Sequence, residues 1–276
     1  MRWFGIILFA GLGISAWWTW NNNSNVRDFV QQVLDNRDIL TLETRFSPEQ
    51  IIAANFNKLA RDSQHSIQEP AVRFYPYLLM DVKYTGNDRR TYEGLLLWSL
   101  VDGEIVLDTE NWETTHGFAD CINSRACRED LIIMQAIAST PRGEISREEL
   151  LKKLAIDPEQ FEELMASAKD KHLVTQQGPL FTLHFENPKI HIQPQTRIAQ
   201  PLVTKSYSHA LRARNFFSPS QLEKMARVAF GNDFTIRSSR EIYLPVYSIE
   251  VLNPDGSILT TYWNALSGRQ MKTNIF

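Results

Sequence analysis

The chain has 276 residues, of which 43% are hydrophobic, 11% aromatic and 22% charged, and its formal net charge is −3. This composition is typical of a globular protein and excludes an intrinsically disordered chain. The mild acidity gives no electrostatic reason to expect nucleic acid as the main partner, and the length is enough for two or three small domains.

Residues 1–20 are predicted to be a transmembrane signal-anchor. The uncharged stretch from Trp3 to Trp20 would span about 27 Å as a helix, and tryptophans lie at both of its ends. We therefore expect contact with membrane lipid through residues 3–20. Arg2 precedes the stretch and predicts that the bulk of the chain is extracytoplasmic, on the periplasmic or extracellular side. The alternative is a signal peptide that is cleaved within residues 1–15.

A juxtamembrane amphipathic helix is predicted within residues 21–40, where apolar residues recur on one helical face between Val26 and Leu34. An α+β module then occupies residues 41–126. Ser47, Pro48 and Gln50 form the start signal of a helix, because serine caps the helix and proline suits its first position.

Strands follow this helix near residues 72–84 and 92–100, with a turn at Asp102-Gly103 and a third strand from Glu104. Pro76 interrupts the first of these strands. Because proline cannot donate to a sheet, we expect this strand to lie at an edge or to carry a bulge.

Cys121 and Cys127 are the two cysteines of the chain. Two cysteines six residues apart in an exported protein predict a local disulfide, and two free thiols are the alternative. The loop is short, so the bond would stabilise a turn and not a whole domain.

Residues 127–192 carry a third pattern. A helix over 127–139 is followed by helices capped by Ser146 and Asp157, and two short strands flank Gly178-Pro179. Three short helices followed by a hairpin resemble the winged-helix fold over residues 127–186. This resemblance implies either DNA binding or protein contact.

The charges of this segment argue against DNA. The helix that would read bases begins at Pro158 and carries Glu159, Glu162 and Glu163. Such a surface repels a duplex, so protein contact is the preferred interpretation.

Residues 193–206 form a proline-containing linker. No acidic residue lies between Asn187 and Leu222, and we expect the positive charges here to pair with carboxylates of the 127–192 domain. The alternative is that they contact an acidic partner or lipid headgroups. Those charges are Lys189, Arg197, Lys205, Arg212 and Arg214.

Residues 207–276 repeat the first module. Phe217-Ser-Pro matches Phe46-Ser-Pro, Pro245 matches Pro76, and Gly268 matches Gly103, with offsets of 171, 169 and 165 residues. The pattern Asn264-Ala-Leu-Ser-Gly-Arg after a helix and a meander resembles the PepSY class of extracytoplasmic modules. The resemblance implies a non-enzymatic binding or regulatory module and transfers no functional residue.

Tyrosines cluster around the two matching prolines. Alternation along an edge strand would expose Tyr75, Tyr77 and Tyr247 as a partner-binding strip. The alternative, left open for Tyr75 and Tyr77, is that these rings cover the helix of their own module.

No catalytic, cofactor-binding or metal-binding motif is present in the sequence, and no small-molecule substrate is evident. The element patterns above predict the α+β fold class, with an N-terminal transmembrane helix and two related modules flanking a winged-helix-like domain. We expect a non-enzymatic, membrane-anchored protein of the cell envelope that binds or assembles proteins or peptides. The alternative is a membrane-bound winged-helix transcriptional regulator with its DNA-binding domain in the cytoplasm.

Overall fold

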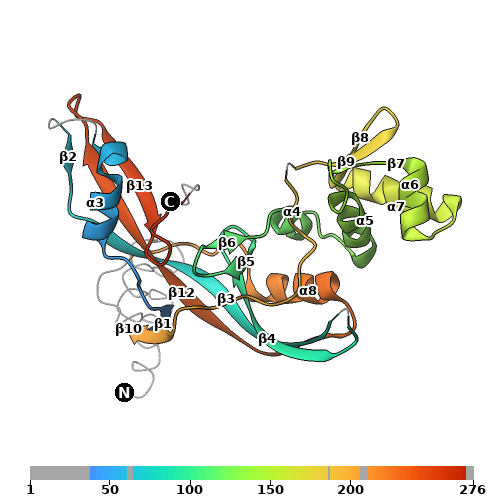
Figure 1. The fold of residues 1–276 in the computed structure, drawn as a ribbon, viewed down its shortest axis with the longest axis horizontal. Helices are drawn as coiled ribbons and strands as arrows, with labels where there is room; N and C mark the ends of the chain where they lie inside the picture. The colour runs from blue at the N-terminus through green and yellow to red at the C-terminus, as the bar shows by residue number, and fades with distance from the viewer. Residues whose placement is uncertain (1–37, 61–64, 87, 186, 206–210, 272–276) are drawn as a thin grey trace, which may run out of the picture. The chain divides into compact units, whose positions relative to one another are not determined.

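A computed structural model of the chain describes residues 38–60, 65–86, 88–185, 187–205 and 211–271 (Figure 1). The predicted membrane segment and nearly all of the predicted juxtamembrane helix lie outside these residues. Within them, no helix combines the length and the apolar character needed to cross a membrane. The chain divides into two units, 1–39 with 204–209 and 40–203 with 210–276. Nearly every described residue belongs to the second unit, whose helices and curled sheet confirm the α+β class.

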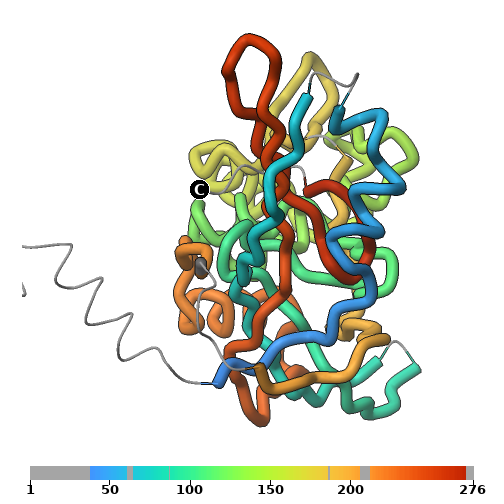
Figure 2. Tube along the Cα trace, turned by 90° about the vertical axis from the view of Figure 1, so that its left-hand side faces the viewer, coloured from blue at the N-terminus to red at the C-terminus, as the bar shows by residue number. Residues whose placement is uncertain are grey.

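Two long antiparallel strands form the centre of the main sheet, β3 (Ala71–Thr85) and β12 (Phe234–Leu252). Figure 2 shows them side by side along most of their length. They come from the first and the second predicted repeat, so the strands of both repeats lie in one sheet. β4 (Thr91–Ser99) pairs with β3, and β13 (Ile258–Asn264) pairs with β12; β5 (Ile105–Asp108) and β6 (Glu113–Thr114) follow β4.

Each repeat also contributes a short parallel strand to this sheet. β1 (Ile39–Leu42) pairs with β12 through Thr41 and Tyr243, and β11 (Leu211–Arg212) pairs with β3 through Arg212 and Phe74. Each short strand therefore lies beside the long strand of the other repeat. Two more short strands complete the sheet, β2 (Ser66–Ile67) beside β12 and β10 (Leu202–Lys205) beside β1.

The expectation of an edge or bulged strand at Pro76 is wrong for the strand as a whole. β3 lies between β12 and β4, and Pro76 pairs with Tyr243 in an uninterrupted register. The Pro76 carbonyl accepts from the Leu100 N–H, so the ring nitrogen faces the point where β11 and β4 both end. Proline is tolerated there because no strand needs its missing N–H.

The two related helices, α3 (Pro48–Leu59) and α8 (Pro219–Phe230), begin as the sequence predicts. Ser47 and Ser218 cap them, and each serine is part of a capping box with the glutamine three residues later. The N–H groups before the caps bond across the repeats, from Phe46 to the Ala265 carbonyl and from Phe217 to the Leu100 carbonyl.

Each helix shares a core with strands of the other repeat. Ile51 and Leu59 of α3 pack in one core with Ile249, Val251 and Trp263 of β12 and β13. The second core joins the buried face of α8 to the first repeat's strands; it includes Leu222, Met225, Ala226, Leu78, Met80 and Trp98. The helix and short strand of each repeat are thus exchanged.

After β6 the chain forms the short helix α4 (Phe118–Asn123) and then α5 (Arg128–Ala138), β7 (Glu144–Ser146), α6 (Arg147–Leu154) and α7 (Pro158–Asp170). A hairpin of β8 (Val174–Gln177) and β9 (Leu180–Leu183) follows, and the order of this small sheet is β7-β9-β8. The predicted helices and hairpin are present, and β7 is an additional strand. Their apolar side chains are continuous with the core beneath α8.

Candidate functional site

The candidate site is a groove between α8 and the stretch that joins α4 to α5. Two hollows of about 430 and 410 Å³ share Lys224 and Val228 of α8. We call this surface the α8 groove. It is lined by Ile122, Asn123, Arg125, Ala126, Arg128, Gln221, Lys224, Met225, Arg227, Val228, Gly231 and Asn232.

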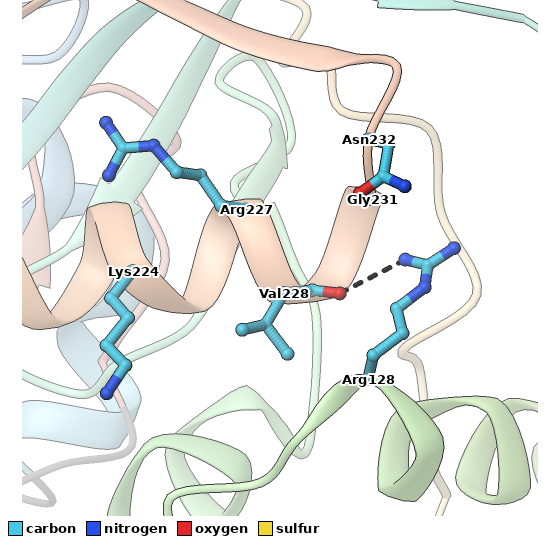
Figure 3. A pocket seen from close by; sticks show the side chains of 6 residues that line it. All are labelled: Arg128, Lys224, Arg227, Val228, Gly231 and Asn232. Carbon is cyan, nitrogen blue, oxygen red and sulfur yellow. Dashed lines mark hydrogen bonds between the residues drawn. The ribbon is translucent and has the colours of Figure 1, made fainter.

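The amphipathic pattern of α8 positions one wall. Leu222, Met225, Ala226 and Ala229 are buried, while Gln221, Lys224 and Arg227 remain exposed. Figure 3 shows the Lys224 and Val228 side chains projecting from the same face of α8, as residues four apart on a helix do.

The opposite wall is held in place by a half-buried carboxylate. Glu104 accepts from the N–H groups of Gly117 at 2.9 Å and Ala119 at 3.2 Å, and from the Thr115 hydroxyl at 2.7 Å. It therefore satisfies the N–H groups at the start of α4. Burial raises the pKa of Glu104, and these hydrogen bonds oppose the rise.

The end of α4 turns the chain toward α8. Arg125 adopts a left-handed φ of 55°, and the Ala126 N–H donates to the Cys121 carbonyl. This geometry is a common way to end a helix. It leaves Arg125 exposed and places Ala126 inside.

Arg128 joins the walls at the far end of the groove. Its Nη1 donates to the carbonyls of Val228 at 3.1 Å and Ala229 at 2.8 Å, near the end of α8 (Figure 3). A cation there interacts favourably with the helix dipole and the unpaired carbonyls. Gly231 ends α8 with a φ of +81°, and a Cβ at that position would lie 2.9 Å from Arg128 Nη2.

The charge of the groove is one-sided. Arg227 pairs with Glu223 at 3.7 Å, whereas Arg125 and Lys224 form no ion pair within the described part of the chain. No carboxylate is among the described residues that line the two hollows. Ile122, Met225 and Val228 line the same hollows, so the surface combines positive charge with an apolar floor.

The three tyrosines expected in a partner-binding strip are buried instead. Tyr75, Tyr77 and Tyr247 are 1%, 2% and 6% exposed, and all belong to the core shared with α3. The Tyr247 hydroxyl donates to the Phe46 carbonyl at 3.0 Å. Burial raises the pKa of each of these phenols. Tyr77 packs edge-on against Trp112, with 5.5 Å between the ring centroids. None of the three rings is therefore open to a partner in this fold.

Cys121 and Cys127 are free thiols in the structure, and each has its own contact. Cys121 is buried with its sulfur 3.8 Å from that of Met134. Cys127 caps α5, and its thiol donates to Asp130 Oδ2 at 3.1 Å. Burial raises the pKa of both thiols. The disulfide stays a prediction.

The linker's charges pair differently from the sequence expectation. Lys189 pairs with Glu113, and Arg197 lies 3.5 Å from Asp108 and 3.6 Å from Glu110. These carboxylates belong to the first repeat and not to the 127–192 domain. The linker thus runs along β5 and the turn that follows it, and Arg197 is used for that contact.

Comparison with protein-family models, curated proteins and solved structures found no match to this chain. Among the described residues, no three histidine, cysteine or carboxylate side chains gather as a metal site would require. The α8 groove itself has no local sequence signal. Its cations come from segments about a hundred residues apart, and only the fold brings them together.

Proposed function

We propose that the protein is a membrane-anchored, extracytoplasmic and non-enzymatic binding protein, and that the α8 groove docks an acidic, amphipathic segment of a partner protein. One observation carries the proposal: Arg125 and Lys224 line a groove that has an apolar floor and no carboxylate among its lining residues. Complementary charge speeds encounter and suppresses wrong partners, while buried apolar area supplies affinity.

The remaining parts take supporting roles in this proposal. Residues 1–20 anchor the chain in the membrane, the two PepSY-like repeats provide a rigid sheet, and residues 127–186 act as a winged-helix-like module for protein contact. The helix–strand–helix–helix–hairpin order with β7 supports the winged-helix assignment. α5 supplies Arg128, so this module contributes directly to the groove.

The charges of the module favour protein contact over the regulator hypothesis. α7 presents Glu159 and Glu163 to solvent, and Glu162 is paired with Arg147 at 2.7 Å. Lys153 and Lys169 bond to groups of the same module, the Ala136 carbonyl and the Gln176 side chain. These cations are therefore engaged, and a DNA phosphate would meet carboxylates along α7.

Site-specific photo-crosslinking tests the docking site. A photoreactive amino acid replaces Asn123, an exposed residue of the groove, in the full chain in its native membrane. We expect a discrete adduct that disappears in Arg125→Glu and Lys224→Glu and persists in the control Lys152→Glu on α6. Lys152 is exposed and does not line the groove. An adduct that survives both groove reversals, or none at all, would refute the proposal.

Topology is tested separately with reporter fusions after Asn23 and after Phe276. Alkaline phosphatase activity at both positions is the expected result for an extracytoplasmic chain. Fluorescence from a reporter that folds only in the cytoplasm would overturn that location and favour the membrane-bound regulator.

A further inference from the structure

A second binding feature lies at the outer edge of β13, away from the α8 groove. Among the described strands, β13 pairs with β12 alone. The Tyr262 carbonyl accepts from Met271 at 2.8 Å and the Asn264 N–H donates to Arg269 at 3.0 Å, so both residues direct these groups away from β12. Backbone groups alternate along a strand, and Ile258 and Thr260 therefore direct theirs to the same outer side.

The first repeat has the same edge, and there it is closed. Leu95 of β4 corresponds to Thr260 at the 165-residue offset, as Trp98 corresponds to Trp263. The correspondence holds in detail, because Trp98 pairs with Ile105 and Trp263 pairs with Gln270, again 165 residues apart.

An extended stretch of the linker closes the β4 edge. The Thr196 N–H donates to the Leu95 carbonyl at 2.6 Å, and the Leu97 N–H donates to Thr196 Oγ1 at 2.8 Å. Thr196 is buried by these contacts, although it is a polar residue of a linker. The molecule thus contains an example of the kind of segment that this edge accepts.

The corresponding end of β13 is exposed and apolar. Ile258 is 61% exposed and Leu259 48%, and Leu252, the register partner of Ile258 on β12, is 37% exposed. An exposed edge strand with apolar side chains is a template for strand addition unless something covers it.

We propose that the outer edge of β13 at Ile258–Thr260 binds an extended segment of a partner protein by strand addition, as the linker closes the edge of β4. The segment supplies a backbone N–H for the Thr260 carbonyl and apolar side chains for Ile258 and Leu259, with a threonine or serine at the position equivalent to Thr196. Main-chain hydrogen bonds provide affinity in this mode, and the alternate side chains provide selectivity. This site is independent of the α8 groove.

The test uses a fluorescent peptide copied from residues 193–200, Gln-Pro-Gln-Thr-Arg-Ile-Ala-Gln, and the full chain in detergent micelles. The matched control peptide carries an N-methyl group on its threonine, which removes the N–H that Thr196 donates. We expect saturable anisotropy for the first peptide and binding about tenfold weaker for the second, the effect of one lost hydrogen bond to an edge.

Thr260→Pro is the matched protein variant, because the proline ring replaces an N–H that faces away from β12. The ring obstructs the outer edge against an added strand and spares the β12–β13 pairing. We expect this variant to lose the peptide. If the variant does not fold, the comparison of the two peptides still decides the question. Equal binding of both peptides, or no binding up to about 1 mM, overturns the proposal. Dimerisation of the full chain that Thr260→Pro abolishes, without peptide binding, assigns the edge to a second copy and likewise overturns it.

Discussion

The backbone N–H of Phe217 donates to the Leu100 carbonyl at 3.0 Å, and this bond connects the helix of one repeat to the strands of the other. The equivalent bond runs from Phe46 to Ala265 at 2.9 Å. The Phe217 ring lies against Gly103 and the Phe46 ring against Gly268, again across the repeats. Neither repeat has a complete core without the other.

This exchange predicts that Gly103 and Phe217 are energetically coupled. A Cβ on Gly103 would lie 2.8 Å from the Phe217 ring, and φ at Gly103 is +75°. We expect Gly103→Ala to lower the free energy of unfolding by about 2 kcal/mol, as strain and contact combine. Urea titration measures the loss. Gly268→Ala, with φ +67° and the Phe46 ring at 3.4 Å, is the matched control and should cost less.

A double-mutant cycle isolates the contact from the backbone strain. In a Phe217→Ala background the ring is absent, so Gly103→Ala should cost about 1 kcal/mol less than in the native chain. Additive effects of the two substitutions would show that the Phe217 ring does not contribute to the cost of Gly103→Ala. Phe46→Ala should leave the cost of Gly103→Ala unchanged.

Local sequence signals predicted the individual helices and long strands well. They did not predict that each helix packs with strands of the other repeat. Ser47-Pro48 and Ser218-Pro219 are complete start signals, because a capping box involves only neighbouring residues. The apolar faces that include Ile51 and Leu222 show that each helix is covered but do not show by which strands. β1, β7 and β11 have two to four residues, which is too few for an alternation of apolar and polar residues to identify them as strands.

The tyrosines show the same limit at the candidate site. Strand alternation places Tyr75 and Tyr77 on one face, but a strand that is covered on both faces has no solvent side to predict. The α8 groove was beyond sequence reasoning for another reason. Arg125 and Lys224 are remote in the chain and become neighbours only because α8 packs on the first repeat and on α4.

Gly231 is predicted to stabilise the fold by leaving room for the Arg128 guanidinium at the end of α8. In Gly231→Ala the new Cβ would meet the guanidinium at 2.9–3.0 Å and displace it from the carbonyls that it caps. Gly256→Ala is the control for a positive φ without a side-chain contact, since φ is +84° there and nothing lies within 4 Å. Gly231 also has ψ −161°, a combination that only glycine adopts readily, so its substitution adds backbone strain of its own. An Arg128→Ala background separates the two causes: we expect Gly231→Ala to cost about 1 kcal/mol less there than in the native chain in urea unfolding, and equal costs would contradict this role of Arg128.

Cys127 is predicted to act as a helix cap in its thiol form. Serine is a strongly preferred cap, so Cys127→Ser should keep or raise the free energy of unfolding, by up to about 1 kcal/mol, in the presence of reductant. Cys121→Ser should instead destabilise by about 2 kcal/mol, because it buries a hydroxyl beside Met134. Denaturant unfolding with and without reductant checks both. A loss in Cys127→Ser that appears only without reductant would mean that the predicted disulfide forms.

The ion pair of Asp130 and Lys171 gives the last prediction, on pH. Asp130 is 1% exposed; burial raises its pKa, but hydrogen bonds from Lys171 and the Cys127 N–H outweigh this, and the pKa lies below its ordinary value of 3.8. The charged form is thus favoured in the fold. Its stabilisation is fully present above about pH 4 and is lost as the pH falls through the lowered pKa.

Removing the cation should therefore have a pH-dependent cost. Lys171→Met leaves a buried carboxylate without its counterion, and we expect a loss of about 3 kcal/mol near neutral pH. The loss should shrink as the pH falls below the ordinary value of 3.8, because a protonated Asp130 no longer needs the ammonium group. Lys152→Met, which removes an exposed cation from α6, controls for net charge. A loss of the same size at both pH values would contradict the prediction, because it would mean that Lys171 stabilises the fold by packing and not through the charge of Asp130.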